Sequence, residues 1–207
     1  KIPENERRLF EEISSRGASS WLSALPLKEH GFVLNKQQFH DALLLRYNLP
    51  FQNIPLSCAC GKVNTLEHCL SCALGGYVYM RHNNIRDLTA NILLEAGCKD
   101  VEVEPQLLPI SGETFNYRLT ITENSARLDV SARNVWSPLD KVYTDIRVFN
   151  SLAPTNNRQS VDDTFRRHEQ EKIRNYNDRV IQVEKATFMP LVFSTTGLMG
   201  PKAEVFY

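Results

Sequence analysis

Residues 126–150, ARLDVSARNVWSPLDKVYTDIRVFN, constrain the fold of this chain more than any other segment. Apolar and polar residues alternate on both sides of the Ser137-Pro138 dipeptide, which is typical of two β-strands joined by a turn. A turn centred on Ser137 places Asp129 and Asp145 at equal distances from it. The segment therefore predicts a β-hairpin in which these two carboxylates face each other across the strands.

Opposed carboxylates in a hairpin repel each other, because directly opposed residues have Cβ atoms only about 4.5–5.5 Å apart. A shared divalent cation offsets that repulsion, and Mg²⁺ is typically held by one or two carboxylates together with water and substrate phosphate. We therefore expect Asp129 and Asp145 to bind Mg²⁺ or Mn²⁺. The alternative is a solvated strand face in which the register is shifted by one or two residues.

The composition bounds the class of protein. A chain of 207 residues with 42% hydrophobic content can bury a core and form one domain with a small appendage. Lys plus Arg number 24 and so do Asp plus Glu, so any nucleic-acid-binding basic surface must be local. No run of about 18 apolar residues occurs, which predicts a soluble intracellular protein without a membrane partner. The start at Lys1 instead of Met predicts a piece of a longer polypeptide; the alternative is simple processing of the chain.

Four of the five cysteines and a histidine lie within one short segment. Cys58, Cys60, His68 and Cys72 form C-x-C and, seven residues later, H-x3-C. His68 and Cys72 would share one helix face, because residues four apart on a helix are neighbours. Three thiolates and one imidazole suit tetrahedral structural Zn²⁺ with no position left for water. The pattern predicts a CCHC zinc knuckle; the alternatives are Cys69 in place of Cys72, or buried reduced cysteines without a metal.

Three regions follow from these patterns. Residues 1–55 show helical spacing, including a helix for which Asn35 is the candidate N-cap, and are predicted to form a helical N-terminal region. Residues 56–80 contain the zinc knuckle. Residues 81–207 alternate between helical and strand patterns, which predicts an α/β core with a sheet covered by helices on both faces.

Several side chains in this core are candidates for the same site as the aspartates. Lys172 continues the buried stripe of a long helix predicted over 160–185, so it either snorkels to solvent or holds the scissile phosphate or the attacking water. Glu104 ends a strand and either reaches the metal or stays an exposed edge carboxylate. His82, near a helix start, is either a phosphate contact or a cap.

Taken in order, these motifs resemble the restriction-like endonuclease domain of site-specific non-LTR retrotransposons, which belongs to the PD-(D/E)xK nuclease superfamily. The resemblance spans residues 56–194, and its weight lies in the order and spacing of the motifs. They are the knuckle, Arg81-His82-Asn83, Glu104-Pro105, Arg127-Leu128-Asp129, Asp145-Ile146-Arg147-Val148, and Lys172 with Tyr176.

The resemblance implies a fold and an activity. The fold would be a PD-(D/E)xK restriction-endonuclease-like core with a central mixed sheet, preceded by the knuckle. The activity would be Mg²⁺-dependent nicking of double-stranded DNA at an insertion target in the nucleus, exposing a 3′ end for a reverse transcriptase on the same polypeptide. The competing interpretations are a nuclease-like zinc-containing module that binds nucleic acid without cutting it, and a zinc-stabilised interaction module.

The resemblance also implies roles for individual residues. Asp129 matches the aspartate of the PD element, Asp145 the acidic residue of the third motif, and Lys172 a lysine displaced onto the following helix. Two positions depart from the family pattern: Leu128 replaces the proline, and Arg147 replaces the D-x-K lysine.

Arginine stays protonated and cannot exchange a proton with water, so Lys172 would have to supply the ammonium. Glu104 is a further candidate catalytic carboxylate. Arg147, Arg81 and His82 are the expected substrate contacts.

Overall fold

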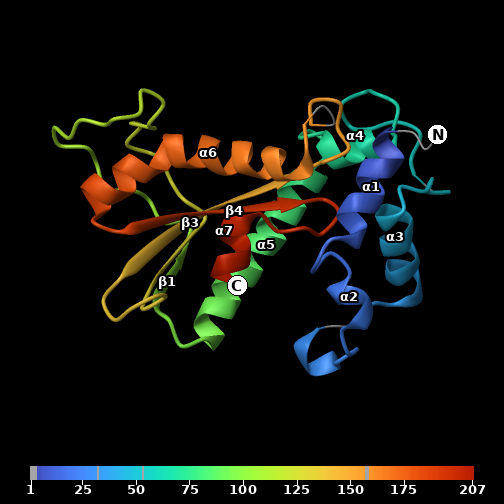
Figure 1. The fold of residues 1–207 in the computed structure, drawn as a ribbon, viewed down its shortest axis with the longest axis horizontal. Helices are drawn as coiled ribbons and strands as arrows, with labels where there is room; N and C mark the ends of the chain where they lie inside the picture. Colours follow the sequence, from blue (N-terminus) through green and yellow to red (C-terminus); the bar gives the residue numbers. More distant parts are fainter. Residues whose placement is uncertain (1–3, 32, 53, 157–158) are drawn as a thin grey trace. The chain divides into compact units, whose positions relative to one another are not determined.

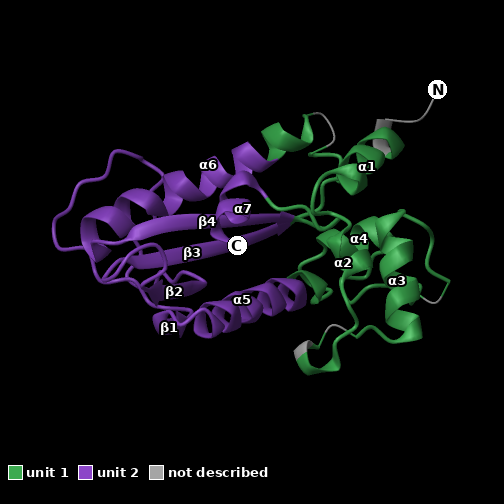
Figure 2. Ribbon diagram, turned by 60° about the horizontal axis from the view of Figure 1, so that its bottom comes forward, with its two compact units in different colours: residues 1–78, 149–164, 194–199 green, residues 79–148, 165–193, 200–207 purple. Residues whose placement is uncertain are grey.

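The structure is a computed structural model that describes residues 4–31, 33–52, 54–156 and 159–207. The chain divides into two compact units (Figure 2). Unit 1 comprises residues 1–78, 149–164 and 194–199, and unit 2 comprises residues 79–148, 165–193 and 200–207. The three-region division expected from the sequence stays a prediction. Among the described residues, no helix has both the length and the apolar character needed to cross a membrane.

The first part of unit 1 is helical. Its elements are α1 (Glu4–Ser14), α2 (Ser20–Ser23), the 3-10 turn η1 (Lys28–His30), α3 (Lys36–Arg46) and α4 (Leu66–Ser71). The predicted cap of α3 is confirmed: the Asn35 side chain accepts from Gln38 N, and the Gln38 side chain accepts from Asn35 N, both at 2.9 Å. This reciprocal capping box satisfies two of the orphan donors at the helix start.

A buried carboxylate joins α1 to the two later segments of unit 1. The Glu12 side chain is fully buried. It accepts hydrogen bonds from the hydroxyls of Ser151 (2.7 Å) and Thr196 (2.5 Å) and pairs with Arg8 at 3.3 Å. Arg8 in turn donates to the Thr164 hydroxyl at 3.3 Å. These long-range contacts explain why residues 149–164 and 194–199 belong to the same unit as α1.

The replacement Glu12→Ala is expected to lower the free energy of unfolding by about 3 kcal/mol, since removing one partner of a buried ion pair leaves the other charge buried and unpaired. Chemical denaturation followed by circular dichroism measures the change. The neighbouring Glu11 is exposed, so Glu11→Ala is the matched control and should change stability by no more than about 0.5 kcal/mol. Equal stabilities of the two variants would contradict the role assigned to Glu12.

Unit 2 contains the sheet, and several of its elements extend into unit 1. They are α5 (Tyr77–Glu95), β1 (Lys99–Val103), β2 (Val130–Arg133), β3 (Lys141–Phe149), α6 (Val161–Arg179), the π-helical turn η2 (Val180–Glu184), β4 (Thr187–Ser194) and α7 (Pro201–Phe206). The strand order is β1-β2-β3-β4, and β2 runs antiparallel to both β1 and β3. The chain returns from β3 to β4 through α6, and the four-stranded sheet is mixed, as predicted (Figure 1).

The hairpin formed by β2 and β3 has the turn centre predicted from the sequence. Val130 pairs with Thr144 and Arg133 with Lys141, so each pair is equidistant from Ser137. The regular pairing stops at Val130, one residue short of the expected pair of aspartates. There Asp129 N donates to Thr144 O at 3.0 Å instead of continuing the ladder. The aspartates therefore lie where the regular pairing of β2 with β3 ends, and they are not a directly opposed pair within the ladder.

Helices cover both faces of the sheet, as expected for an α/β fold (Figure 2). Beneath α6, Ile173 and Tyr176 pack on a core that includes Tyr143. On the opposite face, Ala90 and Leu93 of α5 pack on β2. Among the residues that the structure describes, core clusters of unit 2 include Leu107, Ala126, Leu128, Tyr143, Val180 and Phe188; Ala90, Leu93, Val130 and Ala132; and Ile146, Leu191, Phe193 and Ala203.

Some boundaries differ from those expected. The sequence predicts that Arg81-His82-Asn83 opens a helix, but α5 begins earlier, at Tyr77. The long helix predicted to end at Lys185 changes to a π turn at Val180. The apolar run Leu191 to Ser194 predicts a strand, and β4 begins earlier, at Thr187. Pro190 lies within β4, which is an edge strand, where a residue without a backbone donor is tolerated.

Candidate metal sites

Local structure brings the four knuckle ligands of unit 1 together. The segment from Cys58 to Lys62 forms a tight turn in which Gly61 N donates to Cys58 O (2.8 Å) and Cys58 N donates to Lys62 O (2.9 Å). Gly61 has φ +83°, a conformation that favours glycine. The Thr65 hydroxyl caps α4 by accepting from His68 N at 3.1 Å. His68 thus lies in the first turn of α4.

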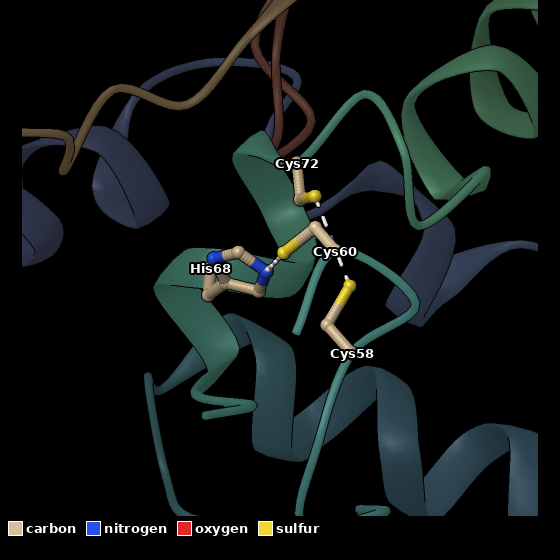
Figure 3. Close-up of side chains that lie close together, drawn as sticks. All are labelled: Cys58, Cys60, His68 and Cys72. Carbon is tan, nitrogen blue, oxygen red and sulfur yellow. Dashed lines mark hydrogen bonds between the residues drawn. The ribbon is translucent and has the colours of Figure 1, made fainter. Parts of the chain in front are cut away.

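The geometry of this cluster fits a tetrahedral zinc ion (Figure 3). The ligand atoms of Cys58, Cys60, His68 and Cys72 all lie within 4.8 Å of one another. Two thiolates bound to one Zn²⁺ at about 2.3 Å with tetrahedral angles are about 3.8 Å apart, and the Sγ atoms of Cys58 and Cys72 are 3.8 Å apart. Cys60 Sγ is 3.2 Å from His68 Nε2. The cluster can therefore hold a structural zinc ion through three thiolates and one imidazole.

The contacts around the cluster indicate which of Cys69 and Cys72 is the fourth zinc ligand. Cys69 lies outside the cluster, where its thiol donates to Asn64 Oδ1 at 3.6 Å. Cys72 is the member of the cluster. Desolvation raises the pKa of the Cys72 thiol, but hydrogen bonds from the Gly75 backbone and the Cys58 side chain leave this pKa below its ordinary value. Such contacts favour the thiolate form that binds a metal.

Purified protein is expected to contain about one zinc ion per chain, a number that follows from one tetrahedral ligand set. Elemental analysis by mass spectrometry measures it. Replacing Cys72 by Ser should abolish stoichiometric zinc and lower the melting temperature, because structural zinc contributes folding energy. The matched control is Cys69→Ser, which should retain zinc; loss of zinc in this control but not in Cys72→Ser would overturn the ligand assignment.

The two aspartates of unit 2 are each held through one carboxylate oxygen. Asp129 Oδ2 accepts from Ile146 N (2.5 Å) and lies 3.3 Å from His82 Nε2. Asp145 Oδ2 lies 2.6 Å from Lys172 Nζ. Among the residues that the structure describes, neither Oδ1 atom has a hydrogen-bond or ion-pair partner. Each carboxylate is thus oriented by the protein and keeps one oxygen available.

Burial dominates the electrostatics of Asp145, whose side chain is only 10% exposed. Burial raises the pKa of Asp145 to about 6, the Lys172 ammonium lowers it, and the charge of Asp129 raises it. Burial and the charges of both aspartates also raise the pKa of Tyr176 to about 12. The two carboxylates therefore influence each other electrostatically, as expected for groups at one site.

The main chain of Glu104 contacts Asp129, but its side chain pairs with residues other than the two aspartates. Glu104 N donates to Asp129 O at 2.9 Å. Its carboxylate pairs with Arg86 of α5 and lies 3.8 Å from Arg127. The structure does not place the Glu104 side chain in a compact group of three metal-binding donors with the aspartates; among the described residues only the cysteine-histidine cluster forms such a group.

The predicted substrate contacts have different surroundings. Arg147 lies on the same face of β3 as Asp145, and its Nη1 is 2.9 Å from Glu171 of α6. Arg81 Nη2 donates to Val148 O at 3.4 Å, while Nε and Nη1 are buried without a hydrogen-bond partner among the described residues. Burial lowers the pKa of Arg81. Both guanidinium groups are thus anchored near β3.

Sequence patterns missed two charged partners. Arg86 holds Glu104, and Glu171 holds Arg147. Arg86 follows His82 by four residues on α5, and residues four apart on a helix share a face. This spacing was the available signal that Arg86 lies on the same side of the helix as His82. No comparable signal linked Glu171 to Arg147, since they come from different elements.

Comparison of the chain with protein-family models and with curated proteins finds no match. The likeness to the restriction-like endonuclease domain therefore rests on the motifs and on their order along the chain.

Proposed function

We propose that unit 2 is a metal-dependent endonuclease of the PD-(D/E)xK type, which hydrolyses a phosphodiester bond of double-stranded DNA. The observation that carries this proposal is the arrangement of the aspartates where the regular pairing of β2 with β3 ends. Asp129 and Asp145 each have one oxygen fixed by the protein and one available oxygen, and an ammonium from α6 contacts Asp145. Two carboxylates with water and phosphate are a usual ligand set for Mg²⁺.

Each residue has a defined part in this proposal. Asp129 and Asp145 would hold the ion. Mg²⁺ or Mn²⁺ would supply a bound water of lowered pKa and would neutralise charge on the phosphate. Lys172 moves from Asp145 to the scissile phosphate or to the attacking water. Arg147 lies on the same side of β3 and offsets phosphate charge, with Glu171 keeping its guanidinium oriented.

The wider biological role is also a proposal. The order of the motifs supports a domain of a mobile-element protein that nicks its target DNA in the nucleus and acts with other domains of a longer polypeptide, such as a reverse transcriptase. The zinc cluster of unit 1 would act as a scaffold or as a DNA-docking element.

One observation favours a second candidate function. The two aspartates already have protein partners, because Asp145 pairs with Lys172 and Asp129 contacts His82. A site neutralised in this way can be a remnant of a nuclease that binds nucleic acid without cutting it. Glu104, a candidate third carboxylate, is likewise neutralised, by Arg86.

Nicking of supercoiled plasmid DNA in the presence of Mg²⁺ tests the first candidate. The replacement Asp129→Asn should lower the nicking rate by about 100-fold or more, because metal-ion catalysis is worth several kcal/mol. The exposed Asp162 of α6 offers the matched control, and Asp162→Asn should nick like the wild type. Wild-type protein that binds DNA but never nicks it would support the second candidate.

Binding of Mn²⁺ in unit 2 is expected to weaken as the pH falls through about 6. The reason is that burial raises the pKa of Asp145 to about 6, and a carboxylate must be deprotonated to bind a metal. Above this pH the deprotonated form is present, and below it protons compete with the ion. Electron paramagnetic resonance titrations of Mn²⁺ between about pH 5 and about pH 8 measure the effect. Affinity independent of pH over this range would argue against Asp145 as a ligand.

A further inference from the structure

We infer that His82 is a positioning residue that orients the metal-binding carboxylate of Asp129, in place of a direct contact with substrate phosphate. This inference rests on the proposed function and assigns His82 a specific part in it. His82 Nε2 lies 3.3 Å from Asp129 Oδ2, and the histidine side chain is 30% exposed while that of Asp129 is 15% exposed. The imidazole therefore lies against the carboxylate in a partly buried place.

Two donors meet on the same oxygen of Asp129. Oδ2 accepts from Ile146 N as well as from His82. A carboxylate held by two donors on one oxygen cannot rotate freely, so its Oδ1 is presented in a fixed direction. Partners of this kind fix the orientation of first-shell ligands and typically change metal affinity or activity by about 10–100-fold when they are lost.

The position of His82 is itself fixed by the core. Ile85 follows His82 by three residues on α5 and therefore lies on a neighbouring face. Ile85 packs against the cluster that contains Ile146, the residue whose backbone supplies the second donor. One set of apolar contacts thus places both donors relative to Asp129.

The other candidate partner on α5 is already engaged. Arg86 lies one turn after His82 and pairs with Glu104 and Asp87. Of the side chains on this helix that the structure describes, His82 is the one recorded in contact with Asp129. Helix α5 therefore contributes to the site through the imidazole of His82, which contacts Asp129, while Arg86 pairs with Glu104.

Two variants of the full chain separate positioning from other roles. His82→Leu removes the donor, and His82→Gln keeps a side-chain N–H at a similar reach without an ionisable ring. We expect His82→Leu to weaken Mn²⁺ binding about 10-fold, His82→Gln to stay within about 3-fold of the wild type, and DNA affinity without added divalent metal to stay unchanged in both. Paramagnetic resonance measures Mn²⁺ binding, and fluorescence anisotropy measures DNA binding.

His40→Leu is the matched control, because His40 forms an exposed histidine-aspartate pair with Asp41 at the same 3.3 Å distance. Its Mn²⁺ affinity should equal that of the wild type. Zinc content and melting temperature are measured for every variant. If His82→Leu fails to fold, the His82→Gln variant decides the inference. A Mn²⁺ affinity of His82→Gln near that of the wild type supports the inference.

Each contrary result has a distinct meaning. Unchanged Mn²⁺ affinity in His82→Leu with weaker DNA binding would overturn the inference in favour of a phosphate contact. Tighter Mn²⁺ binding would show that His82 acts only as a competing cation, and a His82→Gln variant as weak as His82→Leu would show a role other than donation. Wild-type protein that binds no Mn²⁺ in unit 2 and nicks no DNA would instead overturn the proposed function.

Discussion

The buried ion pair between Asp145 and Lys172 is the interaction on which the proposed site of unit 2 depends. Moving a carboxylate out of water is costly, and an ammonium at 2.6 Å offsets part of that cost. Removing the lysine would leave a buried charge without compensation. The same pair serves chemistry in the proposed mechanism, since it delivers an ammonium to the place where a phosphate would bind. Both the stability of the buried Asp145 and the proposed mechanism therefore require that Lys172 of α6 point towards β3.

The end of the β2–β3 ladder is the second constraint. Continuous pairing would fix Asp129 and Asp145 directly opposite each other, where like charges destabilise a sheet. Because the pairing stops at Val130, Asp129 turns its carboxylate to the backbone of Ile146 and to His82. The Asp129 carboxylate is thus held by a backbone donor of β3 and by His82 of α5, while Lys172 of α6 contacts Asp145.

Unit 1 is stabilised by different means. The buried carboxylate of Glu12 accepts hydrogen bonds from hydroxyl groups of distant segments. A structural zinc ion in the cysteine-histidine cluster would contribute folding energy. Polar and metal contacts of this kind are directional, so they fix the arrangement of loops that have little regular structure. Several apolar side chains around the knuckle remain exposed, including Leu56 and Leu74, so the knuckle itself has little apolar core.

The sequence by itself determined what depends on neighbours along the chain: the turn centre at Ser137, the cap at Asn35 and the spacing of the zinc ligands. These features arise from alternation, capping and short loops, which leave a local signal. Only the tertiary structure decided that Glu104 pairs with Arg86, that His82 contacts Asp129 and that Glu12 is buried beneath distant hydroxyls. Such partners come from elements far apart in the chain, and their pairing depends on how helices pack on the sheet or on one another, which no local pattern records.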